Sequence, residues 1–239
     1  MSRARKFRSR EKGKLLTVAS PFEMREAYNM IRANLLFTGH GEKCPIYAVS
    51  SALPNEGKSM NAMNIAISFS MTGKRVLLID GDMRKPVVDK YFQLRRENGL
   101  SELLAQITST CVYKQTKYEN LFIMTAGITP PNPSELMSSV AFDELLKVAA
   151  TEFDYIIIDT PPIGIISDAF SLAEKVTGYI LVVKAMSTDR QRLAEMVDMI
   201  KRLNGNVVGF VMNDVAGRSK RVKRGRYGYY DYYNKEENQ

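Results

Sequence analysis

The fold is decided between residues 46 and 59, which read Ile46-Tyr47-Ala48-Val49-Ser50-Ser51-Ala52-Leu53-Pro54-Asn55-Glu56-Gly57-Lys58-Ser59. The opening residues are mostly apolar and predict a strand over 46–50, and a helix is predicted to begin near Gly57. A Gly-Lys-Ser ending in this place is typical of phosphate binding, although Ala52 replaces the glycine that opens the usual pattern. Backbone N–H groups at the helix start, the lysine ammonium and the serine hydroxyl would face phosphates and Mg²⁺. The predicted nucleotide-binding residues are Pro54, Asn55, Glu56, Gly57, Lys58, Ser59 and Met60.

From Pro45 onward, short β-branched runs alternate with longer amphipathic runs. This alternation is typical of parallel strands linked by crossover helices. Strands are predicted at 46–50, 75–80, 121–125, 155–159, 179–183 and 207–211. Helices are predicted at 57–71, 100–105, 133–151, 167–176 and 188–203, with Asn132 as a cap before Pro133. The strands are nearly continuously apolar, so we expect an α/β fold of the P-loop NTPase type, with a mostly parallel central sheet covered by helices on both faces.

Acidic residues follow two of the predicted strands. Asp80 ends one strand and is followed two residues later by Asp82, and Asp159 ends another. The carboxyl ends of parallel strands meet at one edge of a sheet, so these acids should lie beside the phosphate loop. Mg²⁺ prefers a few carboxylates and hydroxyls, with water and phosphate completing its shell. Ser59, Asp82 and Asp159 are therefore the predicted metal ligands, directly or through water, for a nucleotide bound with Mg²⁺.

The last thirteen residues, 227–239, hold five of the twelve tyrosines and almost no aliphatic side chains. Such a segment cannot bury a core of its own, so we predict a flexible tail that is a substrate of the domain before it. The predicted phosphoacceptors are Tyr227, Tyr229, Tyr230, Tyr232 and Tyr233.

A tyrosine that attacks a phosphate needs a group to take its proton or orient its hydroxyl, because a phenol has an ordinary pKa near 10. Asp80 is the candidate, since Asp82 is the better magnesium ligand of the two. For Arg84, two interpretations are open: it offsets charge on the transferring group, or it forms a salt bridge with Asp80 or Asp82. The predicted catalytic residues are thus Lys58, Asp80, Asp82, Arg84 and Asp159.

The net charge of +8 lies at the two ends of the chain: residues 1–14 carry +6 and residues 218–239 carry +4, which leaves −2 for the rest. The central part is not basic, so we expect no specific nucleic-acid binding. We predict a basic arm over 1–20, one P-loop domain over 21–217, and the tyrosine tail over 218–239.

Several other classes of site and location are disfavoured by composition. Cys44 and Cys111 are too few for a disulfide framework or a zinc site, and His40 alone gives no support to Ser-His-Asp or Cys-His nucleophiles. No run of about 18 uncharged apolar residues and no secretory signal is encoded, so we expect the protein in the cytosol.

Three motifs and the tail together resemble a known family, the bacterial tyrosine kinases of capsular and exopolysaccharide synthesis in their free cytoplasmic form. The motifs are Pro54-Asn55-Glu56-Gly57-Lys58-Ser59, Leu78-Ile79-Asp80-Gly81-Asp82-Met83-Arg84-Lys85-Pro86, and Ile157-Ile158-Asp159-Thr160-Pro161-Pro162 with Asp168 downstream. The resemblance covers nearly the whole chain. It implies an ATP- and Mg²⁺-dependent kinase with Lys58 on the phosphates, Ser59, Asp82 and Asp159 around Mg²⁺, and Asp80 activating the tyrosine.

The resemblance also implies partners and regulation. It implies phosphorylation of the tail in trans within a ring of subunits, control of polysaccharide polymerisation and export, and a cognate tyrosine phosphatase. A membrane-spanning adaptor would recruit the kinase to the inner face of the cell membrane and switch it on. The family places an adenine contact at the end of the last strand, which is Asn213 here.

The segment 21–37 is predicted to be a separate helix, with Met24, Ala27, Tyr28, Ile31 and Leu35 on one face. It either packs on its own domain or uses its charged residues, Glu23, Arg25, Glu26 and Arg32, for a subunit contact. The stretch 26–32 resembles the ring-forming Glu-x-x-Arg-x-x-Arg motif of the family, but Asn29 stands where the middle arginine is expected.

The alternative function is that of a spatial-organising ATPase of the MinD/ParA kind, which shares the sheet and both acidic motifs. Those proteins place a lysine four positions before the glycine of the Gly-Lys pair. Leu53 stands there in this chain, and this difference and the tyrosine tail favour the kinase.

Overall fold

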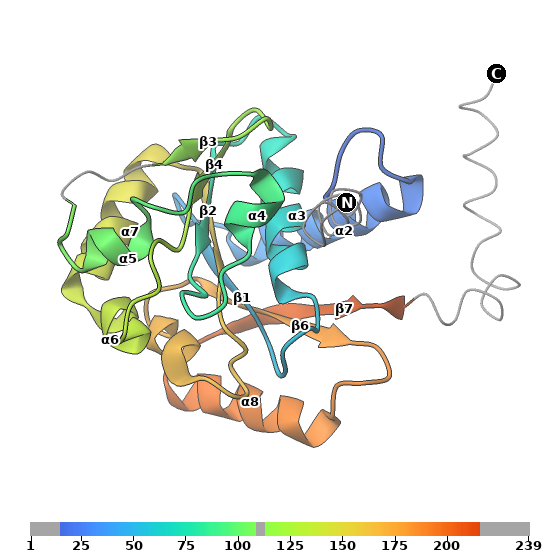
Figure 1. Ribbon diagram of the computed structural model, residues 1–239. Helices are drawn as coiled ribbons and strands as arrows, with labels where there is room; N and C mark the ends of the chain where they lie inside the picture. The colour runs from blue at the N-terminus through green and yellow to red at the C-terminus, as the bar shows by residue number, and fades with distance from the viewer. Residues whose placement is uncertain (1–14, 109–112, 216–239) are drawn as a thin grey trace, which may run out of the picture.

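The protein is described by a computed structural model over residues 15–108 and 113–215 (Figure 1). The described residues form one seven-stranded sheet with the order β3-β4-β2-β5-β1-β6-β7. Neighbouring strands are parallel except for β3 and β4. The strands are β1 (Ile46–Ser51), β2 (Val76–Asp80), β3 (Lys114–Gln115), β4 (Leu121–Met124), β5 (Tyr155–Asp159), β6 (Gly178–Lys184) and β7 (Val207–Asn213).

Helices cover both faces of the sheet, as the apolar strands predicted. On one face lie α2 (Phe22–Thr38), α3 (Lys58–Ser70) and α4 (Val88–Phe92). The other face carries α5 (Leu100–Leu104), α6 (Pro133–Ser138), α7 (Val140–Glu152), the 3₁₀ helix η2 (Ser167–Leu172) and α8 (Arg190–Arg202). Side chains alternate across each strand, so Ile156 and Ile158 of β5 belong to one core layer and Ile157 to the other.

The predicted helix 133–151 is two helices, because the backbone is extended at Ser139, with ψ at 154°. The Ser139 hydroxyl accepts a hydrogen bond from the Phe142 N–H at 3.3 Å and so begins α7 as its N-cap. Pro133 does start α6, but Asn132 makes no capping hydrogen bond through its side chain, which donates to Glu135 instead. The segment predicted as a helix at 167–176 is the 3₁₀ helix η2.

Two short elements, α4 and β3, were not predicted. Helix α4 has the sequence Val-Asp-Lys-Tyr-Phe and β3 consists of only Lys-Gln, so neither contains the run of apolar residues by which the other short elements were predicted. Strand β3 pairs antiparallel with β4 at the edge of the sheet.

Helix α2 packs on its own domain. Leu35 is buried, and Met24, Tyr28 and Ile31 lie against the core layer that also contains α3. The Tyr28 hydroxyl donates to Asn61 at 3.1 Å and accepts from Asn64 at 3.1 Å. The chain just before α2 is also anchored, because Leu15 and Leu16, which the expected basic arm included, are buried.

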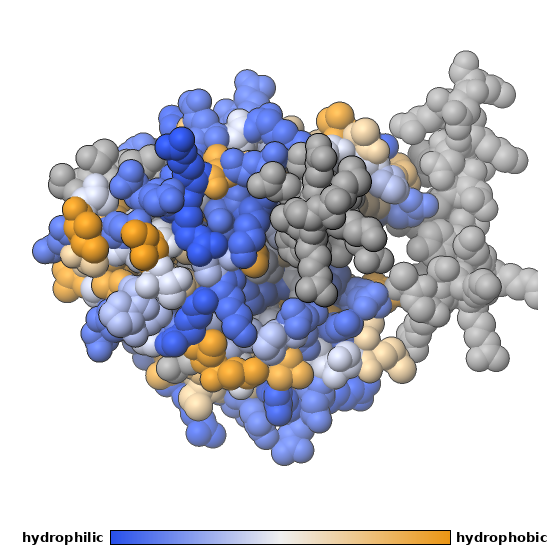
Figure 2. Space-filling view, in the orientation of Figure 1, coloured by the Kyte–Doolittle hydropathy of each residue, from blue (hydrophilic) through white to orange (hydrophobic). Residues whose placement is uncertain are grey.

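The face shown in Figure 2 is mostly hydrophilic, and its apolar atoms lie in separate small patches. Scattered apolar residues of this kind are ordinary on the surface of a folded domain. Within the two described ranges, no helix is both long and apolar enough to cross a membrane.

Candidate active site at the carboxyl edge of the sheet

The loop between β1 and α3 has the backbone that a phosphate loop needs. Gly57 has φ at +97°, a conformation that favours glycine, and a Cβ there would lie 2.1 Å from the Asn213 amide nitrogen. Asn55 has φ at +64°, which asparagine tolerates better than most residues. The loop leads directly into the 13-residue helix α3, which begins at Lys58. Its first N–H groups and its dipole therefore point toward the loop.

The register of the sheet brings the predicted acids to this loop. Asp80 and Asp159 are paired neighbours at the ends of β2 and β5, and Asp159 is also paired with Val49 of β1. The prediction that strand ends bring these acids beside the phosphate loop is confirmed by these pairings. All three predicted carboxylates are buried, with Asp80 and Asp159 at 0% exposure and Asp82 at 5%.

Lys58 lies among these carboxylates. Its Nζ is 2.9 Å from Asp82 Oδ2, 3.1 Å from Ser59 Oγ and 3.6 Å from Asp159 Oδ1. Burial lowers the pKa of Lys58, but the charges of Asp159 and Asp82 outweigh it, and the net pKa is raised. The ammonium therefore stays charged.

Asp80 and Asp159 have carboxylate oxygens without hydrogen bonds from the described residues. Asp80 Oδ2 accepts from the Val88 N–H at 3.1 Å, whereas Asp80 Oδ1 and both oxygens of Asp159 accept none. Burial and the neighbouring Asp159 charge raise the pKa of Asp80 well above its ordinary value. Burial also raises the pKa of Asp159, although the Lys58 charge opposes it.

Buried carboxylate oxygens that accept no hydrogen bond, beside a serine hydroxyl, fit a divalent cation. Asp82 differs from Asp159, because Lys58 occupies its Oδ2 and the Lys85 N–H donates to its Oδ1 at 3.0 Å. Within residues 15–108 and 113–215, no three acidic, histidine or cysteine residues could hold an ion by themselves. Water and phosphate oxygens would therefore complete the shell, as Mg²⁺ prefers.

Arg84 pairs with neither Asp80 nor Asp82, so the interpretation of Arg84 as a salt-bridge partner of one of these two acids is wrong. Its Nε and Nη2 donate to the two oxygens of Asp168 at 2.8 and 3.1 Å. The Ser134 hydroxyl also donates to Asp168. This bidentate pair joins the loop after β2 to η2 and α6. Burial alone would raise the pKa of Asp168, but hydrogen bonds from Arg84 and Ser134 lower it.

Replacing Asp168 by Asn is expected to lower the free energy of unfolding by about 1–3 kcal/mol at pH 7, because the Arg84 charge loses its partner. The lowered pKa of Asp168 stabilises the folded state above the ordinary carboxyl pKa of about 4, and this stabilisation is lost as the pH falls through the folded-state pKa. Urea denaturation of both proteins at pH 7 and pH 3 should show the difference narrowing at pH 3. An equal difference at the two pH values would show that the ion pair does not stabilise the fold.

The remaining predicted residues are placed as follows. The Asn213 side chain donates to the Glu56 carbonyl at 2.9 Å, so it lies against the phosphate loop. Cys44 is buried, and burial raises the pKa of its thiol to about 11, which makes it a poor nucleophile. Cys111 and the five predicted phosphoacceptors, Tyr227 to Tyr233, lie outside the described residues. The sequence argument did not find Ser134, which donates to Asp168, or Thr188, whose hydroxyl donates to Glu56 in the phosphate loop. No local sequence pattern connects either residue to the site.

Comparisons with known proteins are consistent with this geometry. A model of the ParA family, described as NUBPL iron-transfer P-loop NTPase, matches residues 44–227. The putative tyrosine-protein kinase CapB of Staphylococcus aureus is 35% identical over 189 residues, which cover 79% of this chain and 83% of CapB.

Two solved structures extend the comparison. The kinase domain of the Escherichia coli tyrosine kinase ETK superposes with a TM-score of 0.76 at 28% identity, covering 79% of this chain and 74% of that domain. The cell division ATPase MinD of Pyrococcus furiosus has a TM-score of 0.62 at 22% identity and covers 74% of each chain, a likeness of fold alone.

Proposed function

The chain belongs to the bacterial tyrosine kinases, within the ParA-type P-loop NTPases, and on that premise we propose that it transfers the γ-phosphate of ATP to its own C-terminal tyrosines. The acceptors are Tyr227, Tyr229, Tyr230, Tyr232 and Tyr233. The observation that carries the proposal is the convergence of Lys58 with three buried carboxylates at the start of α3. This arrangement combines a phosphate cradle, a cation site and a proton acceptor at one edge of the sheet.

Lys58 and the N-terminus of α3 bind the phosphates. The ammonium exchanges its contact with Asp82 Oδ2 for phosphate oxygens, and the first N–H groups of α3 donate to them. Ser59, Asp82 and Asp159 hold Mg²⁺ directly or through water. When bound, Mg²⁺ neutralises charge on the β- and γ-phosphate oxygens. Asn213, at the end of β7, contacts the adenine side of the nucleotide.

Asp80 takes the proton of the attacking phenol. Its Oδ1 has no partner among the described residues, so it can accept a hydrogen bond from the tyrosine hydroxyl. The raised pKa of Asp80 makes its carboxylate a stronger base than an exposed aspartate. Arg84 contributes through its pair with Asp168, which holds the loop that carries Asp82.

Transfer between subunits can be tested by mixing two variants. Lys58→Met keeps the tail but loses the phosphate ligand, whereas a variant with all five tail tyrosines changed to Phe keeps the site but has no acceptor. We expect phosphotyrosine on the Lys58→Met chain in the mixture with Mg·ATP and on neither variant alone. Mass spectrometry of the tail peptides distinguishes the two chains. A mixture that stays unlabelled while the wild type labels itself would show transfer within one chain.

We place the kinase at the inner face of the cell membrane, recruited and activated there by the cytoplasmic segment of a transmembrane adaptor. In this setting it regulates the polymerisation and export of capsular or exopolysaccharide, and a cognate tyrosine phosphatase reverses its phosphorylation. Family membership supports these roles. Loss of polysaccharide chain-length control in a strain that carries Lys58→Met would test them.

Trans phosphorylation requires that two copies of the chain meet, and a ring-shaped homo-oligomer is the form that we propose for this contact. The charged residues of the candidate contact helix are partly engaged inside the subunit. Asn29 donates to Glu26 at 2.8 Å, and Arg32 donates to the Ser68 carbonyl at 2.8 Å. We therefore expect a weak assembly, which sedimentation at increasing protein concentration would measure.

A further inference from the structure

Glu56 is an unexpected residue for a loop that holds a triphosphate. Its side chain is buried, with the residue at 2% exposure, and it lies directly before Gly57 and Lys58. A buried negative charge is costly unless it is paired or hydrogen-bonded, and here it would also repel the phosphates. The carboxylate is satisfied by two donors from different parts of the chain. Oε2 accepts from the Leu53 N–H at 2.8 Å, and Oε1 accepts from the Thr188 hydroxyl.

Thr188 belongs to the segment between β6 and α8, and its hydroxyl is fixed by its own turn. Thr188 Oγ1 accepts from the Lys184 N–H at 2.8 Å, and the Thr188 N–H donates to the Lys184 carbonyl at 3.1 Å. The next residue, Asp189, caps α8 by accepting from the Gln191 N–H at 2.7 Å. The hydrogen-bond donor that meets Glu56 is therefore held by a closed turn and not by a loose loop.

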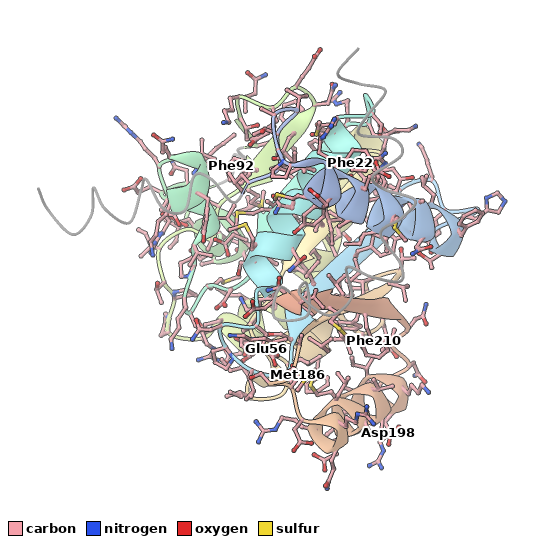
Figure 3. The ribbon with its side chains drawn as sticks, turned by 90° about the vertical axis from the view of Figure 1, so that its right-hand side faces the viewer. Phe22, Glu56, Phe92, Met186, Asp198 and Phe210 are labelled. Carbon is pink, nitrogen blue, oxygen red and sulfur yellow. The ribbon has the colours of Figure 1, made fainter. Side chains whose placement is uncertain are left out.

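A second contact reaches the same loop from β7. Asn213 Nδ2 donates to the Glu56 carbonyl at 2.9 Å, and the Ala185 N–H donates to the Asn213 carbonyl at 2.9 Å. Both contacts thus come from the adjacent carboxyl ends of β6 and β7, where Lys184 and Asn213 are paired. In Figure 3, the labels of Glu56 and Met186 mark the phosphate loop and the β6–α8 segment at this edge of the sheet.

We propose that Glu56 is a positioning residue, which fixes the phosphate loop to the ends of β6 and β7 so that nucleotide meets a preformed site. The group formed by Leu53, Glu56, Thr188 and Asn213 is called the Glu56 clasp. Its carboxylate faces Leu53 and Thr188, so it leaves the phosphates to the backbone and Lys58. The clasp acts on nucleotide affinity and on the KM for ATP, and it does not take part in proton or phosphoryl transfer. This inference rests on the proposed nucleotide-binding function.

The test compares Thr188→Val with Thr188→Ser, because valine replaces the hydroxyl with a methyl group and serine retains it. Valine also removes the acceptor of the Lys184 N–H, so the melting temperature is needed to separate a local loss of stability from a loss of affinity. The dissociation constant of Mg·ADP is measured by calorimetry on the full chain, together with the melting temperature without nucleotide. We expect Thr188→Val to weaken Mg·ADP binding by roughly tenfold, the range of a hydrogen bond to a charged group, and Thr188→Ser to restore affinity. In tyrosine phosphorylation, Thr188→Val should raise the KM for ATP and leave kcat nearly unchanged.

Glu56 variants complete the test. Glu56→Gln can still accept from Leu53 and donate to Thr188, so it should bind Mg·ADP better than Glu56→Ala. Thr188→Val should weaken Mg·ADP binding less in Glu56→Ala than in the wild type, since both changes break the hydrogen bond between Thr188 and Glu56. If Thr188→Val leaves the affinity for Mg·ADP unchanged, with or without a lower melting temperature, the proposed role of the Glu56 clasp is wrong. Absence of Mg·ADP binding by the wild type would instead overturn the proposed function.

Discussion

Changing Asp159 to Asn is expected to lower the rate of tyrosine phosphorylation by about 10³-fold or more, because the change would remove a charged ligand from the proposed cation site. The same change should raise the melting temperature of the nucleotide-free protein. Both Asp159 oxygens are buried without hydrogen bonds, and the charge raises the pKa of the neighbouring Asp80. An asparagine removes that repulsion and adds an amide donor.

Activity should fall while the melting temperature rises. A residue that only stabilises the fold would lower both, so this combination is specific to a cation site. Wild-type protein should gain stability from Mg·ADP, by about 2.7 kcal/mol at a ligand concentration one hundred times the Kd. Asp159→Asn should lose that gain. Differential scanning fluorimetry with and without Mg·ADP measures both changes. Asp154→Asn is the matched control, since Asp154 is a half-exposed aspartate that pairs with Lys74 at 3.5 Å. A nucleotide-free Asp159→Asn protein that melts below the wild type would contradict a purely functional role for this carboxylate.

Changing Asp80 to Asn is expected to lower kcat for tyrosine phosphorylation by about 10²–10⁴-fold, the range for a general base, while the Kd for Mg·ADP changes only a few-fold. The amide cannot take the phenol proton but keeps an acceptor for the Val88 N–H, which donates to Asp80 at 3.1 Å. A large loss of kcat with little change in the Kd for Mg·ADP would assign Asp80 to proton transfer and not to nucleotide binding. Equal losses in affinity and kcat would instead identify Asp80 as part of the nucleotide or cation site.

The pH dependence of the wild type gives a second readout. Burial and the Asp159 charge raise the pKa of Asp80, and only its deprotonated form can accept a proton. Activity should therefore fall as the pH decreases through that raised pKa, at a higher pH than an ordinary aspartate would cause. The remaining activity of Asp80→Asn should lack this decrease. The profile is measured as kcat/KM for ATP against pH, because this ratio reports the pKa values of the free protein.

The sheet and the acidic site could be predicted from the sequence because both depend on local rules. Apolar runs define the strands, and parallel topology places Asp80 and Asp159 at the same edge as Lys58. The register pair of Asp80 with Asp159 is the direct outcome of that rule.

Contacts between distant parts of the chain could not be predicted. Arg84 meets Asp168 across 84 positions, and Thr188 meets Glu56 across 132 positions. The start of the predicted helix 133–151 was right, but its continuity was wrong. The Ser139 hydroxyl accepts a hydrogen bond from a backbone N–H and so begins a second helix. Whether a serine within a predicted helix caps a new helix depends on how its side chain packs in the folded protein.

The central claim is that Lys58, Asp80, Asp82 and Asp159 direct the γ-phosphate of a magnesium-bound ATP to a phenol and not to water. The most direct test incubates the purified chain with Mg²⁺ and γ-labelled ATP, with and without an adaptor's cytoplasmic segment, and measures phosphotyrosine and free phosphate in the same sample. We predict label on the C-terminal tyrosines that requires Mg²⁺ and is lost in Lys58→Met. Release of free phosphate without tyrosine labelling under both conditions would contradict the account and favour a spatial-organising ATPase.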